Sequence, residues 1–117
     1  MTLAASYTMS LPEWLVADLS DLPPVLHTRE EQMALVNSLA DRNWRAGGGG
    51  PFAAIVVDDD TGALVSAGVN VVLGTGITSG HAEVMALGLA QTALGRWDLG
   101  AGGANLALVV NWRPCVQ

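Results

Sequence analysis

The chain has 117 residues and a net charge of −6, from eleven acidic residues against five Arg and no Lys, and half of it is hydrophobic. These values indicate one globular domain with a modest core and exclude a disordered chain. They also weigh against a nucleic-acid substrate, because proteins bind phosphate backbones chiefly through clustered Lys and Arg, and this sequence has no basic run.

Targeting features favour a cytoplasmic protein. No apolar run approaches the ~20 residues that a membrane helix needs. The first six residues lack the basic start of a secretion signal. A single Cys, Cys115, cannot form an internal disulfide, which fits a reducing compartment and leaves its sulfur available to a metal.

Residues 1–27 are predicted to form an N-terminal extension with one short helix. Ser10 and Glu13 have the spacing of a capping box in front of an apolar stretch, and Pro23-Pro24 would end the helix. His27 stands alone in the following turn and is expected to be solvated. This segment is interpreted as a cover over the core.

Residues 28–117 are predicted to form one α/β domain. Thr28 and Glu31 give a second capping box, and apolar residues at helical spacing predict a helix over about 29–45 with Trp44 in the core. The glycine run 47–50 leaves a helix and opens a strand, the reverse of a phosphate-binding loop, so a connector is predicted.

Two strands are predicted next, at 51–57 and 63–72, antiparallel through the turn 58–62. Three adjacent carboxylates in that turn could suggest a cation site, but they lack the alternating spacing of a calcium loop, and a solvated hairpin tip is favoured. A third apolar strand at 106–110 is predicted to be central in the sheet. A right-handed crossover would place it parallel to one of the first two strands.

Chemistry-bearing residues gather at two predicted helix starts. His81 and Glu83 begin a helix over 81–94, with Thr78 or Ser79 as its N-cap and Gly95 after its end. Pro114-Cys115 follows the third strand and has the pattern of another helix start, where a thiol gains thiolate character. Both starts follow the carboxyl ends of strands, so they are expected to meet at one edge of the sheet.

The combination His81-Ala82-Glu83 with Pro114-Cys115 resembles the signature of zinc deaminases, H-x-E followed by P-C-x-x-C. The chain thus resembles the cytidine deaminase-like superfamily, in the branch of guanine and tRNA adenosine deaminases. The resemblance runs from about residue 30 to the last residue and includes Gly50-Pro51-Phe52-Ala53-Ala54 and Gly68-Val69-Asn70. It implies a three-layer α/β/α sandwich with a mixed sheet, in which strands one and two are antiparallel and strand three is parallel.

The resemblance also implies roles for single residues. His81 and Cys115 would be ligands of Zn²⁺, and Glu83 would move the protons of a hydrolytic deamination that releases ammonia. Asn70, Phe52 and the main-chain amide of Ala82, together with that of Glu83, would bind the substrate. The expected substrate is a small molecule, a free base or nucleoside: a guanine-like purine is favoured and cytosine or cytidine comes next.

Two departures from the signature bear on function. Its second Cys would be residue 118, whereas the chain ends at Gln117 and so lacks the predicted third ligand, the C-terminal helix and further strands. Arg113 stands where relatives usually carry an acidic residue. The alternative interpretation is therefore a catalytically incompetent fragment or interaction module that keeps the fold, with His81 an exposed cap and Cys115 a core residue.

The 117-residue chain by itself is expected to bind zinc weakly, to lack activity and to self-associate, whereas the parent protein is expected to be an enzyme and a homo-oligomer. A reading frame that continues to a Cys at position 118 would favour the enzyme; a stop codon after Gln117 would favour the alternative.

Overall fold

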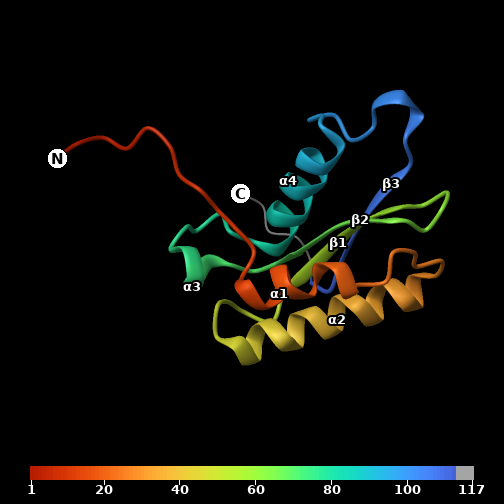
Figure 1. Ribbon diagram of the computed structural model, residues 1–117, viewed down its shortest axis with the longest axis horizontal. Helices are drawn as coiled ribbons and strands as arrows, with labels where there is room; N and C mark the ends of the chain where they lie inside the picture. The colour runs from red at the N-terminus through yellow and green to blue at the C-terminus, as the bar shows by residue number, and fades with distance from the viewer. Residues whose placement is uncertain (113–117) are drawn as a thin grey trace.

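A three-stranded sheet lies between two helical layers in the computed structural model, which describes residues 1–112 (Figure 1). Helices α1 and α2 cover one face of the sheet and α4 covers the other, so the predicted three-layer architecture is confirmed. The strands are β1 (Ala53–Asp58), β2 (Leu64–Val69) and β3 (Leu106–Val110), and the α-helices are α1 (Glu13–Asp18), α2 (Arg29–Ala46), α3 (Val72–Thr75) and α4 (Ala82–Leu94). Two 3₁₀ turns, at Leu19–Asp21 and Ala101–Gly103, complete the elements.

The strand order is β2-β1-β3, and both β2 and β3 pair with β1 in the antiparallel sense. The predicted central place of the third strand and its parallel pairing in a mixed sheet are therefore wrong for the described residues, where β1 is central and β3 lies at an edge. The predicted direction, parallel to one of the first two strands, is confirmed. The crossover through α4 carries the chain past β1, so β3 runs in the same direction as β2 without touching it. A crossover rule fixes the direction of the returning strand relative to the strand it leaves, but not its neighbour.

The two faces of β1 supply both halves of the core. Ala53, Ile55 and Val57 pack in the cluster under α1 and α2, whereas Ala54 and Val56 pack in the cluster under α4. This alternation follows from the period of two along a strand. All five side chains are buried, because the sheet is covered on both sides.

Helix α2 starts as predicted, since the Thr28 hydroxyl accepts a hydrogen bond from the Glu31 amide at 3.1 Å. Its inward stripe is Gln32, Val36, Leu39, Ala40 and Asn43. Trp44 is 63% exposed, so its predicted place in the core is wrong. The last inward position of the stripe belongs to Asn43, and Trp44 points away beside it.

Two other predicted caps are wrong. Helix α1 has Pro12 as its N-cap, without a side-chain hydrogen bond, because Ser10 lies two residues too early. The N-cap of α4 is His81 rather than Thr78 or Ser79. A turn in which the His81 amide donates to the Ser79 carbonyl at 2.8 Å delays the helix.

The predicted strand 63–72 is shorter in the structure, where β2 ends at Val69 and Val72–Thr75 forms the single turn of α3. Helix α4 ends as predicted at Gly95, which has a φ of 69°.

The hairpin tip 58–62 is held by its own side chains and by α2. Asp58 accepts hydrogen bonds from the amides of Asp60 and Thr61, at 2.8 and 3.2 Å. Arg29 binds Asp59 through two hydrogen bonds of 2.8 and 2.9 Å, and this hydrogen bonding lowers the pKa of Asp59. Within residues 1–112, no group of three or more His, Cys, Asp or Glu side chains is arranged so that it could hold a metal ion.

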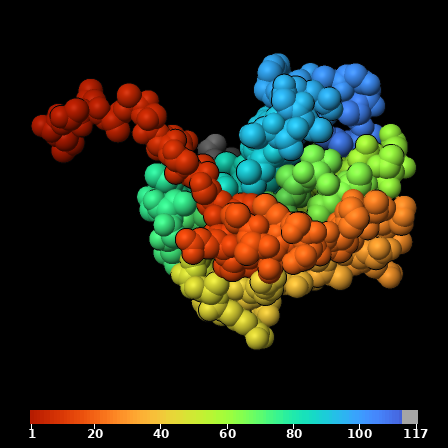
Figure 2. Space-filling model, in the orientation of Figure 1, coloured from red at the N-terminus to blue at the C-terminus, as the bar shows by residue number. Residues whose placement is uncertain are grey.

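The first residues leave the body as an extended, exposed arm (Figure 2). Met9 and Leu11 already pack against the core, and Leu15 is fully buried in it. None of the helices in the described part of the chain has the length and apolar character needed to cross a bilayer.

Candidate active site

A cavity of about 170 Å³ opens at one end of the sheet. Strands β2 and β3 run in the same direction, so their carboxyl ends lie at this end, and the start of the antiparallel β1 lies between them. Helix α4 also begins here. The cavity is lined by Phe52, Asn70, His81, Ala82, Glu83, Val110 and Trp112. Five of these residues were predicted from the sequence to form one site, and the structure brings those five together.

The first turn of α4 contributes an imidazole and a carboxylate. His81 Nδ1 lies 3.6 Å from Glu83 Oε1, which is too long for a hydrogen bond but close enough for attraction when the imidazole is protonated. The His81 side chain is 27% exposed and that of Glu83 13%. Both groups are thus partly shielded from water while they line an open cavity, a setting that suits proton transfer.

The same turn contributes backbone donors. The amides of Ala82 and Glu83 are among the first of α4, and amides there have no carbonyl partner within the helix. They lie at the positive end of the helix dipole, which favours electron-rich atoms of a ligand. Ala82 itself is fully buried, so its backbone is held firmly against β2.

Asn70 follows β2 and faces the helix start. Its Oδ1 accepts a hydrogen bond from the Val72 amide at 3.1 Å, which fixes the plane of the side-chain amide. No described residue accepts a hydrogen bond from its Nδ2. The fixed side chain can therefore offer two N–H donors to an acceptor in the cavity.

Two aromatic rings close the side of the cavity opposite α4. The Phe52 and Trp112 centroids are 6.3 Å apart with the rings tilted by 57°. Asn111 holds this corner: its Nδ2 donates to the Pro51 carbonyl at 3.0 Å and its Oδ1 accepts from the Ala53 amide at 3.0 Å. A flat ring system would find apolar surface here.

Trp112 also lines the cavity, although it was not predicted from the sequence to be a site residue. An aromatic residue between the end of the third strand and Pro114-Cys115 was the available signal. Val110 was missed as well, because a strand residue with an apolar side chain carries no mark of a site.

Arg113, Pro114 and Cys115 lie outside the described residues. His81 is the one predicted metal ligand within residues 1–112. An imidazole and a cysteine sulfur are ligands that zinc prefers, and the sequence offers both, at His81 and at Cys115. The Glu83 carboxylate beside it is the group such sites use for protons, so the residues present fit zinc.

Comparison with known proteins places this geometry in context. Residues 26–117 match the family model of the cytidine and deoxycytidylate deaminase zinc-binding region. A search of the curated proteins found no match.

Solved structures resemble the chain closely. A guanine deaminase from Nitrosomonas europaea is 38% identical with a TM-score of 0.87, over 99% of this chain and 63% of its own. The protein NE0047, solved in complex with 2,6-diaminopurine, is 41% identical with a TM-score of 0.85, over 93% of this chain and 57% of its own. The guanine deaminase of Bacillus subtilis is 33% identical with a TM-score of 0.68, over 75% of this chain and 52% of its own. The chain thus spans less than two thirds of these relatives.

Proposed function

Because the chain belongs to the cytidine and deoxycytidylate deaminase family, and its relatives of known structure include guanine deaminases, we propose that the natural protein is a zinc-dependent hydrolytic deaminase of a free purine base. One observation carries the proposal: His81, Glu83, Asn70 and Phe52 line a single cavity at the start of α4. A small ligand in this cavity would therefore contact a metal ligand, a proton carrier, a hydrogen-bond donor and an apolar ring.

His81 would hold the metal, with Cys115 as its partner in the signature. Bound zinc supplies Lewis acidity, which lowers the pKa of a coordinated water to about 7. Glu83 would accept one proton from the attacking water and give it to the ring nitrogen. It would then take the second proton from the added hydroxyl group and give it to the departing amino group. Overall, water adds at the carbon that bears the amino group, the C–N bond breaks, a carbonyl forms and ammonia leaves.

The other side chains of the cavity would orient the base. The Asn70 amide donates to an acceptor on the ring, and the Phe52–Trp112 corner contacts its flat face. These contacts would hold the base in the cavity both before and during the attack, so they contribute to its affinity more than to kcat.

Charge favours a free base over RNA. The cavity of about 170 Å³ limits only the size of the group that enters it, and an RNA can present a single flipped base. The net charge of −6 without any Lys gives little attraction for a phosphate backbone. A guanine-like purine is the first choice, in line with the guanine deaminases among the relatives, and cytosine or cytidine the second. The single Cys fits action in the reducing cytoplasm. A homo-oligomer remains the expected assembly.

A substrate panel tests the proposal. The natural protein, loaded with zinc, is assayed for ammonia release from guanine, cytosine, cytidine, adenosine and a tRNA anticodon stem. Guanine is expected to be the best substrate by kcat/KM. Preference for the RNA would overturn the argument from charge, and no release from any of the five would overturn the function.

A further inference from the structure

Asn43 occupies an unexpected position for its residue type. It lies in the last turns of α2 and is fully buried, although Asn is a weak helix former whose side chain competes for backbone hydrogen bonds. Its Oδ1 is buried and finds no hydrogen-bond partner among the described residues. A buried oxygen without a hydrogen bond lowers stability, and an apolar side chain would not carry this cost. The hydrogen bonds that the Nδ2 of Asn43 donates must therefore offset it.

The Nδ2 of Asn43 donates two hydrogen bonds to backbone carbonyls, one to Gly50 and one to Asn70, each 2.9 Å long. The Gly50 carbonyl also accepts from the Phe52 amide at 2.8 Å, and the Phe52 carbonyl accepts from the Asn70 amide at 3.1 Å. These four contacts form a closed ring. The ring joins the two backbone segments that carry Phe52 and Asn70 into the proposed active site.

The neighbouring loop is fitted tightly around this ring. A Cβ added at Gly49 would lie 2.1 Å from the Asn70 carbonyl oxygen, so the glycine is needed for the loop to pass over Asn70. The Gly74 amide further ties the loop to α3 by donating to the Gly48 carbonyl at 2.9 Å. The loop therefore has no free space in which to accommodate a displacement of Asn43.

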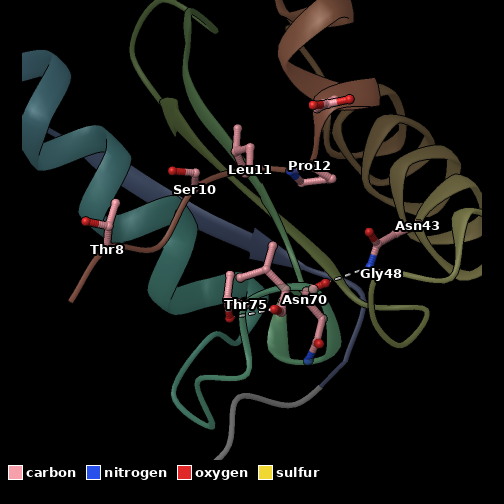
Figure 3. A pocket seen from close by; sticks show the side chains of 11 residues that line it. Thr8, Ser10, Leu11, Pro12, Asn43, Gly48, Asn70 and Thr75 are labelled. Carbon is pink, nitrogen blue, oxygen red and sulfur yellow. Dashed lines mark hydrogen bonds between the residues drawn. The ribbon is translucent and has the colours of Figure 1, made fainter.

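Asn43 does not itself line the proposed active site. It lines a separate cavity of about 370 Å³ between the N-terminal segment and α3 (Figure 3). In that view the Asn43 side chain reaches the backbone of Asn70, the residue that lines both cavities. Any effect of Asn43 on a bound base must pass through Asn70 and Phe52.

We propose that Asn43 is a positioning residue of the deaminase site: it sets the places of Asn70 and Phe52 and thereby the affinity and orientation of the purine base, an inference that rests on the proposed function. Its substitution should weaken the contacts with the base more than the proton chemistry at Glu83. The kinetic signature is a raised KM with a nearly unchanged kcat.

The test compares Asn43→Ala with Gln32→Ala in the natural, zinc-loaded protein. Gln32 is the matched control, since it is also a buried amide on α2, 2% exposed, and its Nε2 donates to the Leu26 carbonyl at 3.0 Å, far from the site. Asn43→Ala is expected to raise the KM for guanine about tenfold and to change kcat less than about twofold, whereas Gln32→Ala leaves both unchanged. Equal effects of the two substitutions would overturn the proposal.

Hydrogen exchange gives a second measurement that needs no activity. The Asn70 amide is expected to exchange about tenfold faster in Asn43→Ala and at the wild-type rate in Gln32→Ala. Unchanged exchange in both would refute the ring. If Asn43→Ala does not fold, Asn43→Ser replaces it, because the serine hydroxyl keeps one hydrogen-bond donor. The kinetic and hydrogen-exchange measurements are then made on Asn43→Ser. Absence of guanine turnover in the wild type would refute the proposed function, while the exchange result would still decide whether Asn43 holds Asn70.

Discussion

His81 and Glu83 stand two residues apart, yet the start of α4 gives them different roles. His81 is the N-cap, with extended backbone, while Glu83 lies within the first turn and is the more shielded of the two side chains. One residue can thus hold a metal at the mouth of the cavity while the other exchanges protons inside it. Removing each group should therefore remove a different property.

In the natural, full-length protein, Glu83→Gln is expected to keep zinc but to lower kcat for ammonia release by at least about 100-fold, because only the proton carrier is lost. His81→Ala, in contrast, should lose zinc itself. Metal analysis of both dialysed proteins, together with ammonia assays, distinguishes the two roles. Near-normal turnover by Glu83→Gln at full zinc content would contradict the assignment.

Single residues were predictable where their spacing carried chemistry. His81, Glu83, Asn70 and Phe52 belong to recognisable motifs, and they line one cavity. Asn43 and Trp112 could not be found in this way. A polar residue inside a helix and an aromatic residue after a strand have many uses, and only the folded chain shows which carbonyls or rings they meet.

At the scale of elements, the distance between α4 and β2 positions the site. Gly68 permits their close approach, since a Cβ there would lie 2.6 Å from both the Ala82 carbonyl oxygen and the Ala86 amide nitrogen. These are backbone atoms and cannot rotate away. The first turn of α4 can therefore lie against β2 only because residue 68 has no side chain.

Gly68→Ala is expected to lower the free energy of unfolding by about 1–3 kcal/mol and to displace the first turn of α4, reducing activity. Gly88→Ala is the matched control on α4, because a Cβ there meets nothing within 4 Å. It should raise stability by about 0.5–1 kcal/mol through better helix propensity. Urea denaturation measures the free energy of unfolding of both variants. An unchanged value for Gly68→Ala would contradict the argument, because it would mean that α4 and β2 can accommodate a Cβ between them.

The ion pair of Arg29 with Asp59 ties α2 to the β1–β2 hairpin, and its hydrogen bonds lower the pKa of Asp59. A lowered native pKa means that the stabilisation is present above the unfolded value of about 3.9 and is lost as the pH falls through the native value. Asp59→Asn should therefore be less stable than the wild type near pH 6, and the difference should vanish in acid.

Urea titrations from pH 6 downward check this. Asp60→Asn serves as the control, since among residues 1–112 the Asp60 side chain has a hydrogen bond only from the neutral amide of Asn105, at 3.3 Å. A difference between wild type and Asp59→Asn that stays constant in acid would contradict the argument.

Element boundaries were predicted more accurately than element neighbours. Helical periodicity and the cap at Thr28 predicted α2 to within a residue at each end, because both signals are local. The pairing of β3 was mispredicted because strand order depends on where a crossover returns, and all three strands are apolar enough to be central.

At the scale of the whole molecule, the outer edge of β3 pairs with no other strand in the described part of the chain. Three of its five residues are Leu106, Leu108 and Val110, and an apolar edge is a template for pairing with another chain. The 117-residue chain is therefore expected to self-associate as its concentration rises.

Size-exclusion chromatography with light scattering should report a mass above 12.1 kDa at high concentration. A monomer at every concentration would contradict this expectation.

The central place of β1 also has a consequence for synthesis on the ribosome. β1 can pair with β2 as soon as the hairpin emerges, but its other flank waits for β3, which is made roughly fifty residues later. About 40 residues separate the end of β2 from the end of β3. At 5–20 residues per second, the buried strand β1 therefore stays half-paired for roughly 2–8 s in every nascent chain. During that interval its open flank is a binding site for chaperones and for neighbouring nascent chains. Slower translation between codons 70 and 105 should therefore lower the yield of folded protein without changing a single amino acid.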